Sequence, residues 1–258
     1  MRKFLKKLYW IVSTQLGFDP RRLLWALRGA PRYLTDLIRF RAAYSGRLYL
    51  QPCLYDWYEE GGATKSEYFW QDLYVAQKIF HSDPQRHVDV GSRLDGFVAH
   101  VASFREIEVF DIRPVTSAIP GVVFKQADLM DPDGLQIGYC DSLSCLHALE
   151  HFGLGRYGDP IDAQGHVTGL RNLHQLLAHG GRLYLSVPVG RARVEFNANR
   201  VFDPAELLQL AASFGLTIES LAWMEPGNTL RESAQLAADT QYLASQDYAL
   251  CIFIFTKQ

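Results

Sequence analysis

The stretch that most constrains the fold is Arg86–Phe97, which reads R-H-V-D-V-G-S-R-L-D-G-F. A short apolar run at 88–90 stops at Gly91, and apolar residues resume with helical spacing after Gly96. This pattern predicts a strand, a tight turn and the start of a helix, which together open a βαβ unit. Gly91 lets the backbone approach a ligand that a Cβ would keep away, and the turn aims the amides of the next helix at that ligand.

An acidic residue at the end of the next apolar run points to a nucleotide. The run at 107–111 reads I-E-V-F-D, and Asp111 follows Asp89 by 22 positions. Nucleotide-binding α/β folds place a ribose-binding carboxylate roughly 20 residues after the first turn. The glycine pattern is incomplete, because Arg93 and Asp95 stand where further glycines are common. The turn alone therefore does not decide which nucleotide binds.

The composition is that of a globular protein. The chain has 258 residues, with 48% apolar and 21% charged side chains, enough for one large α/β domain plus an appendage. Its four cysteines form no C-x-x-C pair, which argues against a disulfide framework and a structural zinc site and favours a reducing compartment. No apolar run approaches the roughly 20 residues needed to cross a bilayer, and no signal peptide is recognisable. We therefore expect a cytoplasmic protein.

The charge is distributed unevenly. Residues 1–47 hold eleven Lys and Arg but only two Asp, whereas the whole chain has a formal net charge of −2. Residues 1–45 read as basic helices, one capped at Asp19-Pro20 and ending at Gly29, the next starting at Pro31. The first helix is predicted from the apolar residues Phe4, Leu5, Leu8, Ile11 and Val12 among the basic residues Arg2, Lys3, Lys6 and Lys7.

Two interpretations of residues 1–45 remain open. They form a helical appendage that packs on the main domain, or a surface that rests on anionic lipid or grips a lipid-phosphate-linked substrate. The second would make the protein peripheral to the inner face of the cytoplasmic membrane. Nucleic acid is not an expected partner, because no nucleic-acid-binding motif accompanies the charge.

The rest of the chain alternates strands and helices. Strands are predicted at 88–90, 107–111, 122–128, 141–147, 183–188, 216–224 and 248–256. Helices are predicted at 71–81, 166–178 and 203–214, with a weak helical segment at 114–119, a loop plus short helix at 225–247 and an aromatic-rich loop at 46–70. The aromatic rings of that loop either cover the core edge or form a platform for a sugar.

Such alternation implies an α/β fold with a doubly wound, mostly parallel seven-stranded sheet whose last two strands form an antiparallel edge. We divide the chain into a basic helical appendage with the aromatic-rich loop, residues 1–70, and an α/β domain, residues 71–258.

Motifs at the strand ends resemble those of class I S-adenosylmethionine-dependent methyltransferases. They are D-V-G-S-R-L-D-G after the first strand, F-D after the second, A-D-L after the third, D-S-L-S-C-L-H-A-L-E-H-F at the fourth and G-G-R-L-Y-L-S-V-P at the fifth. The resemblance covers residues 70–258; L-E-H-F is its most specific element and the glycine turn its least. It implies a Rossmann-like fold and S-adenosylmethionine as cofactor.

Two longer motifs resemble a narrower group. D-P-R-R-L-L-W-A-L-R-G-A-P-R-Y-L near the start and A-L-E-H-F-G-L-G-R-Y-G-D-P in the middle resemble a little-studied bacterial family known only as a domain of unknown function. Its members look like methyltransferases and tend to belong to surface-polysaccharide assembly. This similarity covers nearly the whole chain and implies a glycan or lipid-linked sugar as methyl acceptor, without naming one.

The resemblance also implies which residues bind the cofactor. They are Asp89, Gly91, Ser92 and Arg93 at the methionine end, Asp111 and Ile112 at the ribose, Asp128 and Leu129 at the adenine, and His147. An ionised Asp111 suits two ribose hydroxyl donors. A cation at Arg93 is unfavourable near a sulfonium unless Asp95 or the cofactor carboxylate neutralises it. We favour a bidentate bond from Arg93 to that carboxylate.

The residues after the fourth strand are predicted to carry the chemistry. His151 is the predicted base, with Glu150 beside it, because a histidine with a pKa of about 6.5 suits removal of a hydroxyl proton. Alternatively, both residues cap the next loop or pack beside the cofactor. His147 is another candidate for the base, although its place in a strand pattern favours a buried, hydrogen-bonded residue. The predicted substrate-binding residues are Arg156, Tyr157, Asp159, Asn199 and Arg200. No compact carboxylate–histidine cluster predicts a metal.

Three functions compete at this point. The leading one is an O-methyltransferase acting on a sugar hydroxyl of a bacterial surface glycan or its lipid-linked precursor. The alternative is a catalytically inactive scaffold that keeps the fold, as the incomplete glycine turn would allow. A dinucleotide-dependent oxidoreductase is disfavoured, because neither G-x-G-x-x-G nor a Tyr-x-x-x-Lys pair is present.

Overall fold

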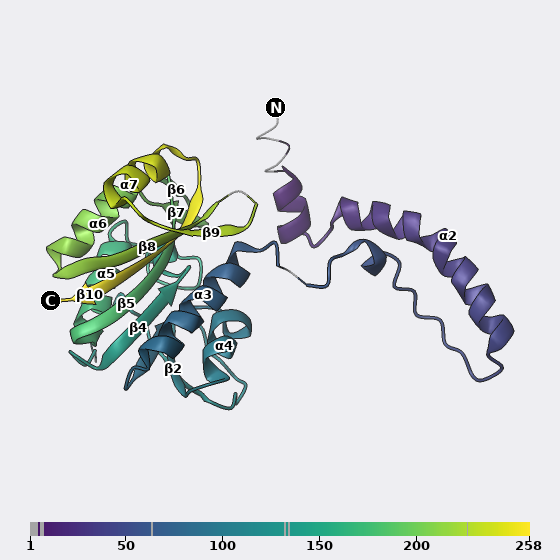
Figure 1. Ribbon diagram of the computed structural model, residues 1–258, viewed down its shortest axis with the longest axis horizontal. Coiled ribbons are helices and arrows are strands. Elements are labelled where there is room, and N and C mark those ends of the chain that lie inside the picture. The colour runs from purple at the N-terminus through teal and green to yellow at the C-terminus, as the bar shows by residue number, and fades with distance from the viewer. Residues whose placement is uncertain (1–4, 6–7, 63, 132, 134, 226) are drawn as a thin grey trace. The chain divides into compact units, whose positions relative to one another are not determined.

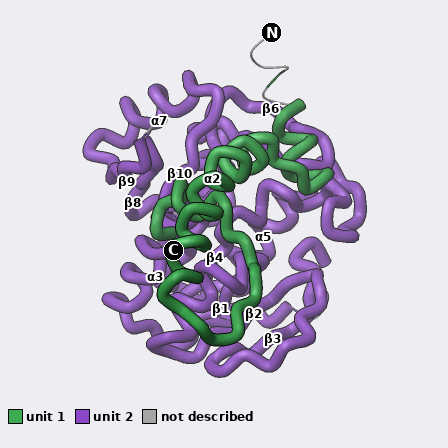
Figure 2. Tube along the Cα trace, turned by 90° about the vertical axis from the view of Figure 1, so that its right-hand side faces the viewer, with its two compact units in different colours: residues 1–63 green, residues 64–258 purple. Residues whose placement is uncertain are grey.

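The computed structural model describes residues 5, 8–62, 64–131, 133, 135–225 and 227–258. The chain divides into two compact units, residues 1–63 and 64–258, coloured separately in Figure 2. This division precedes the predicted boundary at residue 70. The first unit is helical and the second is α/β (Figure 1).

The first unit is built on one long helix, α2 (Pro20–Ala43), preceded by a π-helical turn, η1 (Ile11–Gln15), and followed by a 3₁₀ turn, η2 (Asp56–Tyr58). The Asp19 carboxylate caps α2 by accepting from the amide of Arg21 at 2.9 Å, as the Asp-Pro pair predicts. Of the first predicted apolar and basic stripe, Phe4, Arg2, Lys3, Lys6 and Lys7 lie outside the described residues.

The predicted helix break between Gly29 and Pro31 is wrong, because α2 runs through both residues. Pro31 removes only the hydrogen bond that its own nitrogen cannot donate. Gly29 is buried, and a Cβ there would collide with the carbonyl oxygen of Leu54. The glycine therefore marks a close crossing of two chain segments and not a helix end.

The second unit is organised around one eight-stranded sheet with the order β3-β2-β1-β4-β5-β10-β8-β9. The strands are β1 (His87–Val90), β2 (Ile107–Asp111), β3 (Val122–Gln126), β4 (Cys140–Leu146), β5 (Leu177–Val189), β8 (Leu216–Glu225), β9 (Thr229–Glu232) and β10 (Ala249–Lys257). The first five in the spatial order are parallel, and β10 pairs antiparallel with both β5 and β8. The α/β class and the antiparallel edge are confirmed.

The sheet has one strand more than predicted. Strand β9 pairs antiparallel with β8 inside the segment predicted as a loop and short helix. Its four residues, T-L-R-E, include a single apolar side chain, so no alternation marks them as a strand. A separate two-stranded sheet, β6 (Arg193–Glu195) and β7 (Asn199–Val201), was also missed for want of length.

Helices cover both faces of the large sheet (Figure 1). One layer contains α3 (Glu67–Ser82), the π-helical turn η3 (Leu94–Val98) and α4 (Ala99–Ala102); the other contains α5 (Gly165–Leu176), α6 (Pro204–Ser213) and α7 (Leu236–Ser245). Neighbouring side chains of β5 pack against different helix layers. Tyr184 packs with Ile79 of α3 on one face of the sheet, and Leu185 packs with Leu170 of α5 on the other. The doubly wound arrangement is therefore confirmed.

Two local predictions in the second unit are wrong. The weak helix at 114–119 does not form, and the chain between β2 and β3 is irregular. It contains Pro114 and Pro120, which cannot donate the backbone hydrogen bonds a helix needs. The helix predicted to end at residue 178 ends at Leu176, and β5 starts at once and passes through Gly180-Gly181.

A buried hydrogen-bond network joins β1 to β4. The carboxylate of Asp89 accepts from Ser144 Oγ at 2.5 Å, from Ser92 Oγ at 2.6 Å and from Ser92 N at 3.0 Å. Burial raises the pKa of Asp89 to about 7 despite these hydrogen bonds. Ser92 Oγ also accepts from the amide of Leu146, so the turn after β1 is tied to the end of β4.

His87 extends this network as a neutral ring. Ser144 gives its hydroxyl hydrogen to Asp89, so its oxygen accepts from His87 Nε2 at 3.1 Å, and Nδ1 accepts from Ser142 Oγ at 2.8 Å. Burial lowers the pKa of His87 to about 3. The ring therefore remains uncharged in the folded protein until strongly acidic pH.

We predict that His87→Asn destabilises the protein less at about pH 4 than at pH 7. Between these values the unfolded chain protonates His87, with an ordinary pKa of about 6.5, and the folded protein does not. The wild type therefore loses up to about 1.4 kcal/mol of stability per pH unit from this group as the pH falls, and the variant does not. Urea denaturation across this pH range measures the difference.

The exposed His81 provides the matched control, and His81→Asn should change the pH dependence little. A stability difference between wild type and His87→Asn that stays constant with pH would contradict a buried neutral ring.

Candidate functional site

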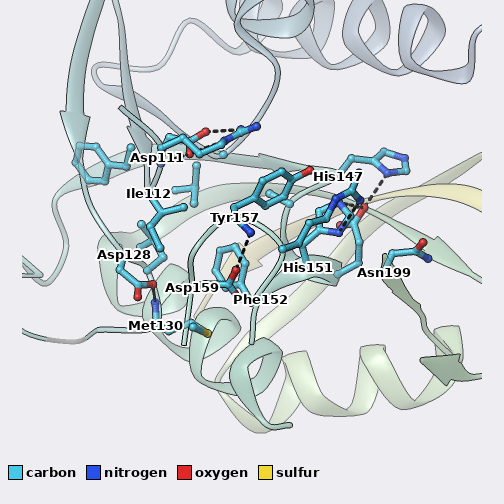
Figure 3. A pocket seen from close by; sticks show the side chains of 18 of the residues that line it. Asp111, Ile112, Asp128, Met130, His147, His151, Phe152, Tyr157, Asp159 and Asn199 are labelled. Carbon is cyan, nitrogen blue, oxygen red and sulfur yellow. Dashed lines mark hydrogen bonds and ion pairs between the residues drawn. The ribbon is translucent and has the colours of Figure 1, made fainter. Parts of the chain in front are cut away.

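A cavity of about 420 Å³ opens at the carboxyl ends of β1, β2 and β4. Figure 3 shows Asp111, Ile112 and Asp128 on one side of it, and His147, His151 and Asn199 on the other. Ligands of open α/β sheets bind at this edge, and a cavity of this size holds a nucleoside-sized molecule. Of the residues predicted for the site, the cavity is lined by Gly91, Arg93, Asp111, Ile112, Asp128, Leu129, His147, Glu150, His151, Arg156, Tyr157, Asp159 and Asn199.

Gly91 forms the floor where the turn after β1 meets the end of β4. Its φ is +71°, and a Cβ at this position would lie 2.9 Å from the Cβ of Ala148. Its amide donates to the carbonyl of Phe110 at 2.9 Å. The glycine is therefore required both by its backbone conformation and by the close approach of the segment after β4.

Asp89 and Ser92, which the sequence predicted to bind a cofactor, are not among the residues that line the cavity. Both side chains turn into the protein, where they bond to each other and to Ser144. The buried polar groups at the turn are thus satisfied by one another. Their role is to hold the turn that carries Gly91.

Arg93 lines the cavity but is already paired. Its guanidinium makes two bonds to the Asp95 carboxylate, at 2.8 and 3.1 Å, and lies over the ring of Tyr68. Of the two partners that the sequence suggested for the Arg93 cation, Asp95 and the cofactor carboxylate, the structure shows the bond to Asp95. The pair is exposed, so it is weak and leaves Arg93 able to exchange partners.

Asp111 ends β2 with its carboxylate at the cavity wall. Arg113 donates to both of its oxygens, from Nη2 to Oδ2 at 2.6 Å and from Nε to Oδ1 at 3.0 Å. The same guanidinium lies 4.5 Å from the ring centre of Tyr157. Arg113 was missed, although its position two residues after the acid in F-D-I-R-P could have indicated the pair.

Asp128 and two apolar side chains complete this side of the cavity. Asp128 Oδ1 accepts from the amide of Met130 at 2.8 Å, which orients the carboxylate at the end of the loop after β3. Leu129 is buried and Ile112 lies between the two acids in Figure 3. Two carboxylates with apolar surface between them suit a flat ring that carries hydrogen-bond donors at both ends.

The opposite side holds a cluster of two histidines around one carboxylate. His147 Nδ1 lies 2.8 Å from Glu150 Oε1, and His151 Nε2 lies 3.6 Å from the same oxygen. Glu150 is buried. Among the described side chains, Glu150 Oε2 and His147 Nε2 are buried with no hydrogen-bond partner. Buried polar atoms left without partners cost free energy, and they mark a place where a ligand can supply the missing bonds.

The pKa values of the two histidines are shifted in opposite directions. Burial opposes protonation of both rings, but the Glu150 carboxylate in direct contact raises the pKa of His147. Burial lowers the pKa of His151, whose Nδ1 donates to the carbonyl of Ala198 at 2.6 Å. Because Nδ1 carries the hydrogen, Nε2 of the neutral His151 ring has a free lone pair.

His147 sits in a backbone conformation that few residues adopt. Its φ is +53°, and its ring lies 4.7 Å from that of Tyr68. Burial and the nearby Glu150 raise the pKa of Tyr68 to about 12, so it stays a neutral phenol. The positive φ turns the chain sharply after β4 and brings Glu150 and His151 to the cavity.

The loop at 153–160 is organised from within. Asp159 accepts from the amides of Gly153 at 2.8 Å, Gly155 at 3.0 Å and Tyr157 at 3.1 Å. Arg156 donates to the carbonyl of Ala198 at 3.0 Å. The Asp159 carboxylate is therefore committed to the loop backbone, although the residue lines the cavity as predicted.

The prediction that Arg200 lines this site is wrong. Its guanidinium is buried and donates to the carbonyls of Glu150, Phe152, Asp162 and Ala163. Burial lowers its pKa, and the carbonyl oxygens replace the lost water. Arg200 thus holds the two ends of the loop at 153–160 through hydrogen bonds outside the cavity, while its neighbour Asn199 lines the cavity.

The remaining wall includes Tyr68, one of the loop aromatics that the sequence offered as a platform for a sugar, and residues that the sequence did not single out for this site. The latter are Val90, Phe110, Arg113, Ala127, Met130, Ala148, Phe152, Pro188 and Tyr248. Tyr248 donates to Glu67 of α3 at 2.5 Å, so residues 181 positions apart meet at the cavity rim. No local pattern reports such a contact.

The described residues contain neither a metal-binding cluster nor a membrane-spanning helix. They contain no group of three or more His, Cys, Asp or Glu side chains arranged to hold a metal ion. None of their helices is both long and apolar enough to cross a membrane.

Comparison with solved structures defines the class of fold. A putative sarcosine dimethylglycine methyltransferase from Galdieria sulphuraria matches with a TM-score of 0.51 and 11% identity, over 73% of this chain and 86% of that one. The N-methyltransferase NodS from Bradyrhizobium japonicum, solved with S-adenosyl-L-homocysteine, matches with a TM-score of 0.50 and 15% identity, over 78% and 91%. The chain has the Rossmann-like fold of class I S-adenosylmethionine-dependent methyltransferases.

Sequence comparison adds a narrower match. Residues 135–246 match the family described as Caenorhabditis protein of unknown function, DUF268. The matched part, less than half of the chain, includes the His147–Glu150–His151 cluster and the loop that follows it. No curated protein matches the sequence.

We predict that Asp159→Asn loosens the loop at 153–160. An amide side chain keeps one acceptor oxygen in place of two and loses the negative charge, so three backbone donors cannot all be satisfied. Hydrogen exchange of the amides of Gly153, Gly155 and Tyr157 should accelerate, and the free energy of unfolding should fall by about 1–3 kcal/mol.

The matched control is Asp131→Asn, since among the described residues Asp131 accepts one amide, that of Asp133, at an exposed turn. Unchanged exchange at all three loop amides would show that Asp159 does not organise this loop.

Proposed function

We propose that this protein transfers a methyl group from S-adenosylmethionine to a hydroxyl oxygen. The observation that carries the proposal is the cavity itself, in which two carboxylates stand opposite a neutral histidine whose Nε2 has a free lone pair. The fold class alone would not suffice, because one fold hosts many functions.

The residues of the cavity fit this cofactor. Asp111 would accept from the ribose hydroxyls and Asp128 from the adenine amino group, with Ile112 and Leu129 against the ring. The turn at Gly91 leaves room for the backbone to approach the methionine portion, because a side chain there has no space. Arg113 would share the Asp111 carboxylate or leave it, which is the one rearrangement that this assignment requires.

When bound, S-adenosylmethionine supplies an electrophilic methyl group and leaves as S-adenosylhomocysteine. His151 Nε2 takes the proton from the acceptor hydroxyl as the oxygen–methyl bond forms and the sulfur–methyl bond breaks. The bond from Nδ1 to Ala198 fixes the ring orientation and the tautomer this step needs. Glu150, 3.6 Å from Nε2, stabilises the imidazolium that results.

A sugar hydroxyl is the acceptor that we propose, in a surface glycan or a lipid-linked precursor. Tyr157, Tyr68 and Tyr248 present rings at the cavity, and Asn199 and Arg156 present polar groups. Rings that pack against the apolar face of a sugar, with amide and guanidinium donors at its edge, suit a ligand of this class. The sequence motifs that resemble a family of surface-polysaccharide assembly are the second reason for choosing this acceptor.

One observation favours a second candidate, a scaffold that binds partners without turnover. Arg113 occupies both oxygens of Asp111, the carboxylate on which cofactor binding depends. A protein in which this pair never opens would not bind S-adenosylmethionine. Direct measurement of cofactor binding therefore separates the two candidates.

We predict that Asp111→Asn weakens binding of S-adenosylhomocysteine about 10- to 100-fold, because a hydrogen bond to a charged group contributes about 1.5–3 kcal/mol. Isothermal titration calorimetry of the full chain measures the affinity. Glu108→Gln is the matched control, since Glu108 lies on the same strand and bonds to Tyr139 and Arg86 outside the cavity. Absence of binding by the wild type would support the scaffold.

We predict that His151→Gln lowers methyl transfer about 100- to 10,000-fold while cofactor affinity stays within twofold, as expected for loss of a general base. Transfer is followed with methyl-labelled S-adenosylmethionine and lipid-linked sugars extracted from membranes. Because the pKa of His151 lies below 6.5, wild-type activity should be constant near pH 7 and fall as acid protonates Nε2.

His81→Gln, at an exposed histidine, should leave both measurements unchanged. Full activity of His151→Gln would remove the base from this mechanism.

A further inference from the structure

The face of α2 that the first unit leaves uncovered is strongly apolar. Five side chains, Leu23, Leu24, Leu27, Leu34 and Ile38, project from one side of this helix, and each is between 49% and 70% exposed. We call them the apolar stripe. Their spacing follows the helical repeat over four turns, so they form one continuous face. Exposed apolar surface of this extent marks an interaction site.

Part of the opposite face of α2 is covered within the same unit. Gly29 is buried where the chain returns at Leu54, and Trp25 packs beside Tyr58, with ring centres 6.5 Å apart. Segment 54–58 thus packs on the Trp25 and Gly29 side of the helix. The apolar stripe lies on the other side, where this segment leaves it exposed.

A row of arginines borders the stripe. Arg21, Arg28, Arg32 and Arg39 recur at intervals of seven, four and seven residues, which places them along one edge of the helix. The only acid in α2 is Asp36, which pairs with Arg32 at 3.4 Å. Trp57 lies against Arg32, with the guanidinium 3.2 Å from the ring centre, and is 68% exposed.

We propose that the apolar stripe of α2 lies in the surface of a membrane that contains anionic lipid. An interfacial helix needs an apolar face to enter the acyl region and cations at its border to meet the phosphates. The arginine row supplies those cations, and an exposed Trp at the border suits the headgroup region. A protein partner would more often present specific pockets or acids, whereas a lipid surface accepts a smooth stripe of leucines.

This proposal is independent of the methyltransferase activity. It concerns the first unit alone and would hold for a scaffold as well as for an enzyme. Its consequence for either is that the second unit works close to a membrane surface, where lipid-linked molecules are concentrated.

The test is flotation of the full chain with vesicles of phosphatidylcholine, either pure or mixed with phosphatidylglycerol. We expect binding to the mixed vesicles, little to the pure ones, and weaker binding as salt rises. Ile38→Glu should abolish flotation. Ile137→Glu is the matched control, because it introduces the same charge at a side chain of similar exposure in the second unit.

A second pair of variants tests the charge. Arg39→Gln should weaken binding to the mixed vesicles about fivefold, the effect of one basic residue near an anionic surface. Arg171→Gln, on α5, removes an exposed arginine of the second unit and should have no such effect. Thermal unfolding that matches the wild type shows that each variant is folded.

Three results would overturn the proposal. Ile38→Glu could float as well as the wild type, which would show that the stripe does not touch lipid. The wild type could bind pure and mixed vesicles equally, which would remove the role of the arginine row. The wild type could fail to float and instead form a dimer that Ile38→Glu dissociates, in which case a second copy of the chain covers the stripe.

Discussion

The site depends on the buried carboxylate of Asp89. It receives three hydrogen bonds, two from Ser92 in the turn after β1 and one from Ser144 on β4. Through Ser92 the same network reaches the amide of Leu146 at the end of β4. Two neighbouring strand ends and the turn between β1 and the next helix are thereby held in one arrangement, and Gly91 can meet Ala148 at the floor of the cavity.

A second group of side chains holds the loop beside the cavity in place without contacting a reacting group. Asp159 gathers three amides of the loop that follows β4, and Arg200 holds four carbonyls of the same region. Loops rarely hold a fixed conformation without such bonds, because their backbone groups lack regular partners. These two residues are expected to act on activity through loop order rather than through contact with a ligand.

The strongest sequence signals concerned residues whose position follows from local structure. A carboxylate at the end of a parallel strand lies at the ligand edge of the sheet, so Asp111 and Asp128 could be placed from the strand pattern alone. His151 and Glu150 followed from the L-E-H-F motif after β4. Asp89 shows the limit of this reasoning, because strand alternation did not reveal that its side chain turns inward to Ser144.

Other parts of the site could not be predicted, because their partners are distant in the sequence or their signals are short. The contact of Arg113 with Tyr157 joins residues 44 positions apart, and the contact of Tyr248 with Glu67 joins residues 181 positions apart. Strand β9 has four residues and exists because β8 offers an unpaired edge. By itself, the sequence determined the α/β class, the helix N-cap at Asp19 and the acids at the strand ends, since these depend on neighbours along the chain. Only the tertiary structure decided which polar groups line the cavity and which form hydrogen bonds inside the protein that hold the cavity walls in place. The reason is that the hydrogen-bond partners of these groups are brought together by folding.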